Sequence, residues 1–237
     1  MTSDFMYASK SIKDFCKVNR VSTTEVADAL GKKGVLKRVK PLNEQHYVVG
    51  NVFPVFTAFG SNYEVHEQIR EVQTGDVVLI FTHECEDLAI IGEVVAKYLV
   101  LYKGAGAVVV SGMVRDVSRL RRDNYPIWCE DFTPLGCNNL KQDRQFPEAL
   151  EREIRSRFEG GIAICDDGGV TVIERDLINA ETLTALHKIE IQEDIWAFCL
   201  NTLKWDTKKI ICDRAYLSEP QLFSSAQVEA LRFLKEI

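Results

Sequence analysis

A strand–helix–strand succession in the middle of the chain limits the possible folds most strongly. Residues 77–81 read VVLIF, an apolar run typical of a buried strand, and a Gly-Asp pair predicts the turn before it. The later part of residues 86–104 is apolar at helical spacing and ends at Gly104. Residues 107–110, AVVV, predict a second buried strand. This order is a βαβ unit, so we expect an α/β domain.

Capping and turn residues predict further elements before this unit. Ser22 and Glu25, three residues apart, form a capping box that predicts a helix over residues 22–30. Residues 47–59 are rich in β-branched and aromatic residues and predict a strand. Pro54 lies within that strand, so we expect the strand to bend or to lie at an edge of the sheet.

The spacing of apolar residues and turn residues predicts the remaining helices and strands. We expect a short helix over residues 62–72, a strand over 127–128, a hairpin over 162–173, a helix over 176–201 and another near 224–237. The polar segment 139–157 is the best candidate for an exposed insertion. We therefore predict one α/β domain over residues 1–200 and a C-terminal helical extension over residues 201–237.

The composition of the 237 residues excludes several classes of protein. Hydrophobic residues make up 46%, which is enough apolar surface for a folded core. No run of about 18 uncharged apolar residues is present, so we expect no membrane span. The N-terminal residues lack the basic-then-apolar pattern of a secretory signal, which favours a cytoplasmic protein. The net charge of −6 gives no indication of a nucleic-acid partner.

The seven cysteines predict free thiols. They are widely spaced and include no C-x-x-C pair, which disfavours a zinc ribbon or a thioredoxin-like site. Several lie in apolar runs, as buried thiols do in a reducing compartment. Cys129 and Cys137 flank a Pro-Gly loop and are the pair that most merits inspection in the structure.

A glycine at the expected start of the central helix is the first candidate for chemistry. Gly92 and Glu93 follow the buried run 77–81 and precede the apolar helix. The backbone amides of Glu93, Val94 and Val95 would then lie at a helix N-terminus. Free N–H groups at such a position attract a carboxylate or a phosphate.

Arg115 and Asp116 form the second candidate, after the strand 107–110. In a βαβ unit both candidates fall at the carboxyl ends of neighbouring strands, where α/β sheets place ligands. A guanidinium binds a carboxylate in bidentate fashion. The neighbouring carboxylate of Asp116 is able to hold a hard cation such as Mg²⁺ together with water molecules. From spacing alone, the alternative is an exposed ion pair.

The chain resembles the RraA-like family, which holds the regulators of ribonuclease activity A and the class II 4-hydroxy-4-methyl-2-oxoglutarate aldolases, also called 4-carboxy-4-hydroxy-2-oxoadipate aldolases. The resemblance spans roughly residues 20–175. It rests on the order and spacing of the blocks STTEVADALGKKGVL, SNYEVHEQIREVQTGDVVLI, GEVVA, GAVVVSGMVRD with YPIWCEDFTPLG, and ICDDGGVTVI. Several blocks in order are more specific than any one motif.

The resemblance implies a fold, an assembly and a reaction. The expected fold is the swivelling β/β/α domain of the RraA-like type with a C-terminal helical arm. The expected assembly is a homotrimer or a hexamer, with sites between subunits. The expected reaction is a divalent-metal-dependent cleavage of a C–C bond in a 2-oxo acid, which releases pyruvate with Mg²⁺ or Mn²⁺ as cofactor. Decarboxylation of oxaloacetate passes through the same enolate and is a second expected activity.

The resemblance also implies roles for individual residues. Arg115 would bind the 2-oxo acid through its carboxylate and keto oxygen, and Asp116 would be the protein ligand of the metal. Glu93 would hold metal-bound water, at a position where aldolases usually have an acidic residue. The amides of Val94 and Val95 would hold the substrate carboxylate, and Gly92 and Glu93 would belong to the same substrate-binding turn.

Several positions depart from the family pattern or stay undecided. Aldolases of the family usually have an acidic residue three positions after the aspartate, whereas this chain has Arg119, which puts the usual substrate in question. His83 lies in an unusual acidic block and is either a further metal or substrate contact or part of a solvated loop. The aldolases also use an acid from a neighbouring subunit, for which Glu190 and Glu193 lie in the right region. His66 matches a family position, yet a packed or hydrogen-bonded histidine is the simpler interpretation.

Three alternative functions follow from the same resemblance. A binding protein that regulates a ribonuclease needs no metal, but that branch typically lacks the aspartate after the arginine, so Asp116 favours an enzyme. A diverged member acting on another hydroxy-oxo acid is the second alternative. A menaquinone methyltransferase ranks last, because the glycines at 104 and 106 precede a strand and predict a turn rather than a methyl-donor loop.

Overall fold

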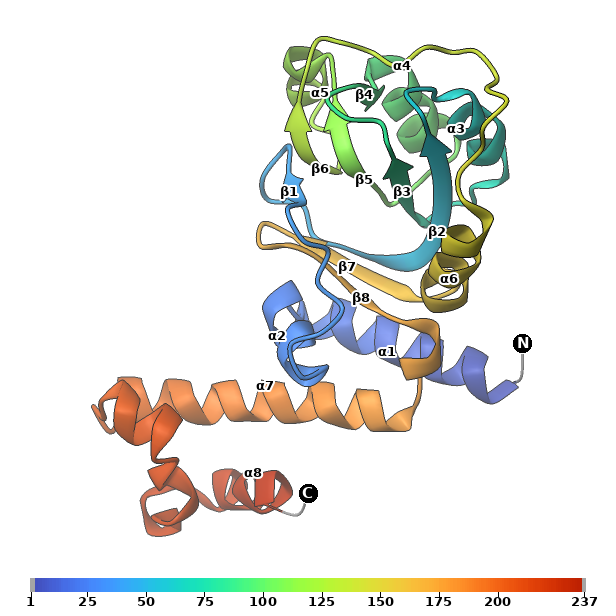
Figure 1. Ribbon diagram of the computed structural model, residues 1–237. Coiled ribbons are helices and arrows are strands. Elements are labelled where there is room, and N and C mark those ends of the chain that lie inside the picture. Colours follow the sequence, from blue (N-terminus) through green and yellow to red (C-terminus); the bar gives the residue numbers. More distant parts are fainter. Residues whose placement is uncertain (1–2, 236–237) are drawn as a thin grey trace. The chain divides into compact units, whose positions relative to one another are not determined.

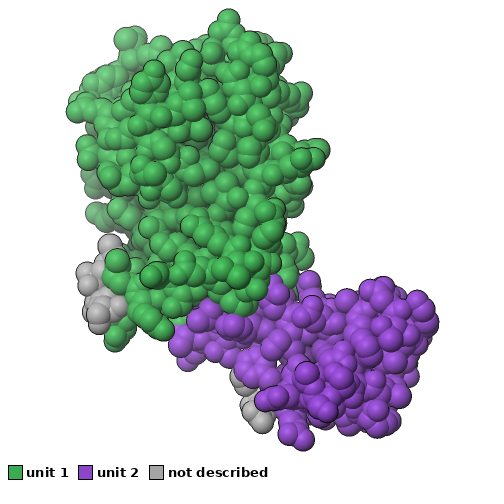
Figure 2. Space-filling view, turned by 180° about the vertical axis from the view of Figure 1, so that it is seen from behind, with its two compact units in different colours: residues 1–179 green, residues 180–237 purple. Residues whose placement is uncertain are grey.

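The computed structural model describes residues 3–235 (Figure 1). The chain forms two compact units, Met1–Asn179 and Ala180–Ile237 (Figure 2). This division falls earlier than the boundary at residue 200 expected from the sequence. The reason is that Ala180–Asn201 is one continuous helix whose Ile195 and Cys199 share a core with the C-terminal helices.

The first unit is a mixed α/β fold with an eight-stranded sheet, which agrees with the α/β class expected from the sequence. The strand order is β1-β6-β5-β3-β2-β7-β8, and β4 pairs with β5 off this path. The pairs β2–β3, β3–β5, β4–β5 and β5–β6 are parallel, and the other pairs are antiparallel. The strands are β1 (Lys40–Pro41), β2 (Val48–Ala58), β3 (Val77–His83), β4 (Ala89–Ile91), β5 (Ala107–Val114), β6 (Ile127–Phe132), β7 (Ile162–Asp166) and β8 (Gly169–Ile173).

The structure contains helices where the sequence analysis predicted them. The helix beginning at Ser22 is present with its capping box: the Ser22 amide donates to Glu25 (2.6 Å), and the Glu25 amide donates to the Ser22 hydroxyl (3.2 Å). The expected exposed insertion contains a helix in its second half. The helices are α1 (Ser3–Asn19), α2 (Thr23–Ala29), α3 (Tyr63–Gln68), α4 (Glu93–Lys97), α5 (Val117–Arg122), α6 (Glu148–Phe158), α7 (Ala180–Asn201) and α8 (Ser225–Lys235).

Pro54 lies where the long strand β2 has a partner on one side only. Strand β7 pairs with Val48–Asn51, and β3 pairs with Val52–Ala58. The half of β2 that contains Pro54 is therefore an edge of the sheet. Proline has no backbone N–H group, and at this edge no hydrogen bond between strands is lost. The strand also curves visibly between its two partners (Figure 1), so the expectation of a bend or an edge is confirmed.

The region 86–104 contains a strand that the sequence analysis did not separate from the helix. Residues Ala89–Ile91 form β4 beside β5, and the helix begins only at Glu93. It continues as a π-helical turn over Tyr98–Tyr102. The cause is that apolar residues occur in both the short strand and the first helical turn, and apolar spacing cannot tell these two states apart.

Alternation along the strands divides the core between the two faces of the sheet. Val78 and Ile80 of β3 pack with residues of α3 and α4, whereas Val77 and Leu79 pack with residues of β7 and β8. Trp128 is fully buried on the second face, and its indole N–H donates to the Asp166 carbonyl (2.8 Å). The helix-covered face thus carries α4, whose first turn forms part of the candidate site. Within residues 3–235 no helix is long and apolar enough to cross a membrane.

Candidate functional site

Two turns that leave adjacent parallel strands lie side by side. Gly92 joins β4 to α4, and Arg115 with Asp116 joins β5 to α5. The two turns are held together where the Arg115 amide donates to the carbonyl of Ile91 (3.0 Å). Both turns lie at the carboxyl ends of their strands, as the βαβ pattern predicts (Figure 1).

The side chain of Arg115 passes between two glycines. A Cβ atom on Gly92 would collide with the Asp116 carboxylate and would lie 3.0 Å from the Cγ atom of Arg115. A Cβ atom on Gly136 would collide with the Arg115 guanidinium and would lie 2.9 Å from its Cζ atom. Gly136 is placed there because it forms a β-bridge with Ala89 of β4. Only residues without a side chain leave room for the guanidinium on both sides.

Asp116 has a backbone conformation that most residues avoid. Its φ of 60° and ψ of 29° lie in the left-handed region, which aspartate tolerates better than most side chains. One carboxylate oxygen, Oδ2, accepts the amide hydrogen of Glu93 (3.1 Å), and the Asp116 carbonyl accepts the amide hydrogens of Arg119 (2.9 Å) and Leu120 (3.1 Å). The carboxylate therefore satisfies the first amide of α4 and links the two turns.

The amides expected at a helix N-terminus are present, with one already used. Helix α4 begins at Glu93, and the Glu93 amide donates to Asp116. The amides of Val94 and Val95 follow in the same first turn, where no intrahelical acceptor exists. Val94 is 78% exposed, whereas Val95 is buried, so the turn faces solvent at Val94.

Arg119, the departure from the family pattern, forms an ion pair with Glu93. Its Nη1 atom lies 2.6 Å from Oε2 of Glu93. The Glu93 hydrogen bond, together with the charges of Glu93 and Asp116, raises the pKa of the Arg119 guanidinium. The Arg119 side chain is 64% exposed and that of Glu93 is 19% exposed, so the arginine lies on the solvent side of the pair. Arg119 thus neutralises the charge of Glu93, the residue that the family resemblance expects to hold metal-bound water.

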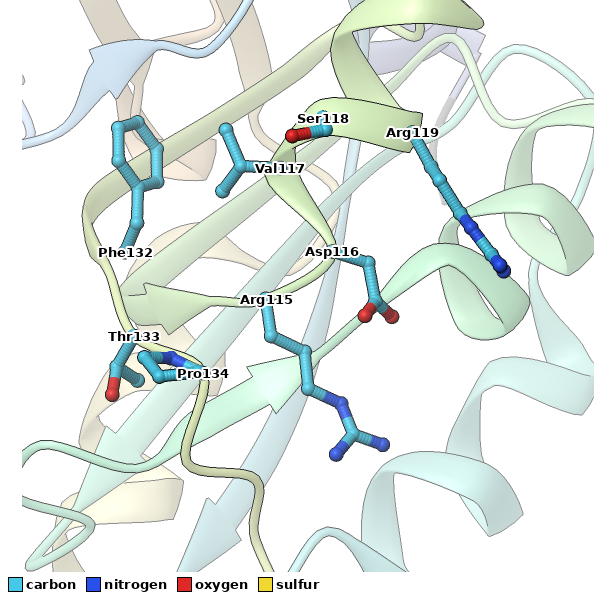
Figure 3. A pocket seen from close by; sticks show the side chains of 8 residues that line it. All are labelled: Arg115, Asp116, Val117, Ser118, Arg119, Phe132, Thr133 and Pro134. Carbon is cyan, nitrogen blue, oxygen red and sulfur yellow. The ribbon is translucent and has the colours of Figure 1, made fainter.

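Two cavities meet at Arg115 and Asp116. One, of about 400 Å³, lies between the β5–α5 turn and the segment that follows β6. In Figure 3 the side chains of Arg115, Asp116 and Arg119 lie on one side of it, whereas Phe132 and Val117 lie on the other. The second cavity, of about 190 Å³, lies between the two turns and the start of α3. Residues Asn62, His66, Ala89–Gly92, Val94, Val95, Arg115, Asp116, Cys137 and Asn139 line it.

The start of α3 contributes His66, which the sequence analysis named, and Asn62, which it gave only as part of a family block. Asn62 is 8% exposed, donates from Nδ2 to the Ile90 carbonyl (3.0 Å) and leaves its Oδ1 atom without a hydrogen-bond partner. His66 follows one turn later, where its amide donates to the Asn62 carbonyl (3.3 Å), and it lines the same cavity. The structure thus brings His66 close to Arg115.

His83, a further candidate from the sequence, is not among the residues that line these two cavities. The ring of His83 packs edge-on against Phe59 (5.6 Å) and Phe146 (5.8 Å), and its Nε2 atom lies 3.5 Å from Glu84. Its neighbours are therefore an aromatic cluster and an acidic loop residue. Glu190 and Glu193 lie on α7 in the second unit.

The donor set fits a magnesium-like ion better than a zinc site. Among residues 3–235 no three His, Cys, Asp or Glu side chains cluster closely enough to hold a metal ion. Zinc sites need three or four protein ligands. Mg²⁺ is bound through one or two carboxylates and otherwise by water and substrate oxygens. The carboxylate of Asp116 occupies the space that a side chain at position 92 would need, and Asp116 lines both cavities. A single carboxylate of this kind fits the way in which Mg²⁺ is bound.

A family model described as RraA-like, Aldolase/RraA, matches residues 23–172. The chain belongs to the RraA-like family. Among its relatives, a protein of Halalkalibacterium halodurans is 36% identical over 164 residues, which cover 65% of this chain and 73% of the relative. The name of that relative provisionally assigns it as a 4-hydroxy-4-methyl-2-oxoglutarate aldolase.

Two solved structures show that the RraA-like chain shares its fold with known proteins. An uncharacterized protein of Pseudomonas syringae has a TM-score of 0.62 at 21% identity and covers 81% of this chain and 93% of its own length. The Streptomyces coelicolor protein RraAS2, described as an unusual member of the RNase ES inhibitor RraA family, has a TM-score of 0.58 at 20% identity. The match covers 74% of this chain and 92% of RraAS2. At these identities the likeness concerns the fold alone.

Proposed function

We propose that this RraA-like chain is a divalent-metal-dependent lyase that cleaves a C–C bond of a 2-oxo acid and releases pyruvate. The proposed substrate is of the 4-hydroxy-4-methyl-2-oxoglutarate type, with oxaloacetate as a second substrate that is decarboxylated. The observation that carries the proposal is the Arg115 guanidinium, fixed between two glycines next to a cavity-lining carboxylate. The name of the 36% identical relative supports the same reaction class.

Binding follows from the donors on the cavity walls. The fork of N–H groups on Arg115 matches two neighbouring oxygens, and the carboxylate and keto oxygens of a 2-oxo acid are such a pair. The amides of Val94 and Val95 supply further donors from the opposite turn for the carboxylate. Asp116 would hold Mg²⁺ or Mn²⁺, which when bound supplies Lewis-acid polarisation of the keto group.

The chain's own groups then assist the cleavage. As the C3–C4 bond breaks, its electron pair moves toward C2 and the keto oxygen, which gains negative charge as pyruvate enolate forms. The Arg115 guanidinium is positioned to stabilise this oxygen. The hydroxyl at C4 loses its proton as it becomes a carbonyl, and a water oriented by the carboxylates of Asp116 and Glu93 is the proposed acceptor. We also propose an acid from a partner subunit, Glu190 or Glu193, in this role.

The assembly and fold assignment belong to the same proposal. The first unit would be the swivelling β/β/α domain of the family, followed by the C-terminal helical arm. The active form would be a homotrimer or a hexamer. The proposed partners are the small 2-oxo acid and other copies of this chain, with neither a membrane nor a nucleic acid.

The Glu93–Arg119 ion pair favours a second candidate function. In this pair Arg119 binds the Glu93 carboxylate, which an aldolase of the family would use to hold water. A binding regulator of a ribonuclease needs no such carboxylate. A diverged lyase acting on another hydroxy-oxo acid is equally compatible with the altered charge.

The test is pyruvate release, coupled to lactate dehydrogenase, from 4-hydroxy-4-methyl-2-oxoglutarate and from oxaloacetate. The assay is run with Mg²⁺, with Mn²⁺ and with EDTA, on wild type, Asp116→Asn and Asp116→Ala. We expect metal-dependent turnover that falls by about 10²–10³ in both variants, the loss typical of one electrostatic group in an active site. Asp123→Asn, which removes a carboxylate paired with Arg122, is the matched control and should keep its activity. Turnover that resists EDTA, or no turnover of either substrate, would refute the lyase.

A further inference from the structure

The two cavities at the candidate site share the wall formed by Arg115 and Asp116. Val94 and Val95, whose amides are the proposed donors to the carboxylate of a 2-oxo acid, line the smaller cavity. An acid bound in this way has its first carbon atoms in the smaller cavity, so the atoms from C4 onward extend past Asp116 into the cavity of about 400 Å³. The walls of this larger cavity therefore select the half of the substrate that leaves after cleavage.

Hydrogen-bond donors line the larger cavity. Arg119 is on its wall and uses Nη1 for the ion pair with Glu93 (2.6 Å), but a guanidinium carries five N–H donors, and the Arg119 side chain is 64% exposed. Ser118 and Thr133 contribute hydroxyl groups. The Thr133 hydroxyl accepts the amide hydrogen of Leu135 (3.2 Å), which leaves its own hydrogen available for a ligand.

Positive charge exceeds negative charge around this cavity. The guanidinium of Arg121 stacks over Phe132, which lines the cavity, with Cζ 5.4 Å from the ring centroid. Together with the two arginines on the wall it faces the carboxylates of Asp116 and Glu93, so the group carries one surplus positive charge. A divalent ion held by Asp116 would raise this surplus to three.

A phosphate ester matches this charge and this set of donors better than a second carboxylate does. A phosphate monoester carries a charge of about −1.5 to −2 near pH 7, so a 2-oxo acid with a phosphate brings about three negative charges, whereas a dicarboxylate brings two. One arginine satisfies both oxygens of a carboxylate, whereas a phosphate has three acceptor oxygens. In Figure 3 Arg119 and Thr133 lie on opposite sides of the cavity, where they are able to bind different oxygens of one phosphate.

We propose that the substrate is a 4-hydroxy-2-oxo acid whose leaving half carries a phosphate ester, and that Arg119 is the specificity-determining residue that binds this phosphate. The inference rests on the proposed lyase function and names the hydroxy-oxo acid of the diverged lyase. The C3–C4 bond breaks, the C4 hydroxyl loses its proton to become an aldehyde, and C3 of the enolate takes up a proton to become the methyl group of pyruvate. The phosphate ester stays on the aldehyde throughout.

The ion pair with Glu93 shapes the variants that test this role. Arg119→Ala removes the proposed phosphate ligand and also leaves the Glu93 carboxylate unneutralised, so it repels an anion in addition. Glu93→Gln removes the competing carboxylate and keeps the guanidinium. The double variant Glu93→Gln/Arg119→Ala has neither charge. A comparison of the double variant with Glu93→Gln therefore isolates the contact between Arg119 and the phosphate.

The first test is calorimetric titration of the full-length protein with glycerol 3-phosphate and with glycerol, which requires no turnover. We expect glycerol 3-phosphate alone to bind, and its Kd to rise roughly 10- to 100-fold from Glu93→Gln to the double variant, the loss typical of a hydrogen bond to a charged group. Arg122→Ala, on the same helix but paired with Asp123, is the matched control and should bind like wild type. The proposal is overturned if glycerol 3-phosphate does not bind, or if the double variant binds it as tightly as Glu93→Gln.

The second test is pyruvate release from 2-oxo-3-deoxy-6-phosphogluconate and from 2-oxo-3-deoxygluconate, which differ only in the phosphate. We expect wild type to favour the phosphate ester in kcat/KM by about tenfold or more, and Arg119→Ala to lose this preference while Arg122→Ala keeps it. Equal kcat/KM for the two compounds in wild type overturns the phosphate assignment, and turnover of 4-hydroxy-4-methyl-2-oxoglutarate or oxaloacetate would then leave the lyase standing. Phosphate binding that depends on Arg119, without pyruvate from any of these acids, defeats the lyase alone.

Discussion

Replacing Gly136 with alanine places a methyl group against the guanidinium of Arg115. The new Cβ atom would lie 2.9 Å from Cζ and closer still to one terminal nitrogen, whereas ordinary contacts are about 3.5–4 Å. The backbone of Gly136 lies outside the left-handed region, so alanine itself is not strained there. The guanidinium is the flexible end of a long side chain and is the group that moves, by roughly 1 Å.

The expected loss follows from that displacement. A shift of about 1 Å costs about 10²-fold in rate, and full removal of one such donor costs about 10²–10³. We therefore expect Gly136→Ala to lower kcat/KM about 10²-fold, or about 2.7 kcal/mol of transition-state stabilisation. The free energy of unfolding should change by less than about 1 kcal/mol, which is roughly 2–4 °C in Tm for a chain of this size.

The assay is coupled pyruvate release together with a thermal melt. Gly112→Ala is the matched control, because its Cβ atom would lie 3.2 Å from Thr82 and 3.6 Å from Ile90. It should keep its activity within about twofold. In an Arg115→Lys background the same Gly136→Ala change should cost less, since the slimmer side chain leaves room for the methyl group. Wild-type kcat/KM in Gly136→Ala, or a loss that matches the unfolded fraction, would refute the reasoning.

Two further predictions concern charge. Arg119→Ala should free the Glu93 carboxylate beside the substrate site and raise KM for a 2-oxo acid severalfold at low salt and less at high salt, with Arg122→Ala as control. An equal KM in both variants would contradict this. Burial raises the pKa of Cys129 from 9.0 to about 12, so between these pH values the unfolded chain releases a proton that the folded chain keeps. Stability is therefore lost as pH rises, by about 1.4 kcal/mol per unit from this thiol. Urea unfolding should show a shallower decline in Cys129→Ala; an unchanged slope would contradict the assignment.

Apolar spacing was sufficient to predict the strands on either side of the site. The runs 77–81 and 107–110 are β3 and β5, and their βαβ order predicts that the two turns carrying Gly92 and Arg115 share one edge of the sheet. Strand β4 was missed because three apolar residues before a glycine read equally well as the start of a helix. Even so, the start of α4 matches the position that the glycine indicated.

Long-range contacts could not be predicted from spacing. Gly136 reaches Arg115 only because its segment runs beside β4. The sequence of a strand of only three residues does not predict which segment pairs with it. Arg119 was visible as a change of charge, but its pairing with Glu93 depends on how α5 is oriented over α4.

The left-handed backbone at Asp116 also restricts which substitutions the family can accept there. At φ 60° an alanine or a β-branched residue strains the turn, whereas asparagine and glycine do not. A descendant that gives up the carboxylate therefore loses least stability by passing through asparagine or glycine. Among natural variants of this chain, Asn or Gly at position 116 would mark a lost metal ligand in a fold kept for another task, while Ala or Val would mark a chain that has also lost roughly 1–2 kcal/mol of stability at this turn.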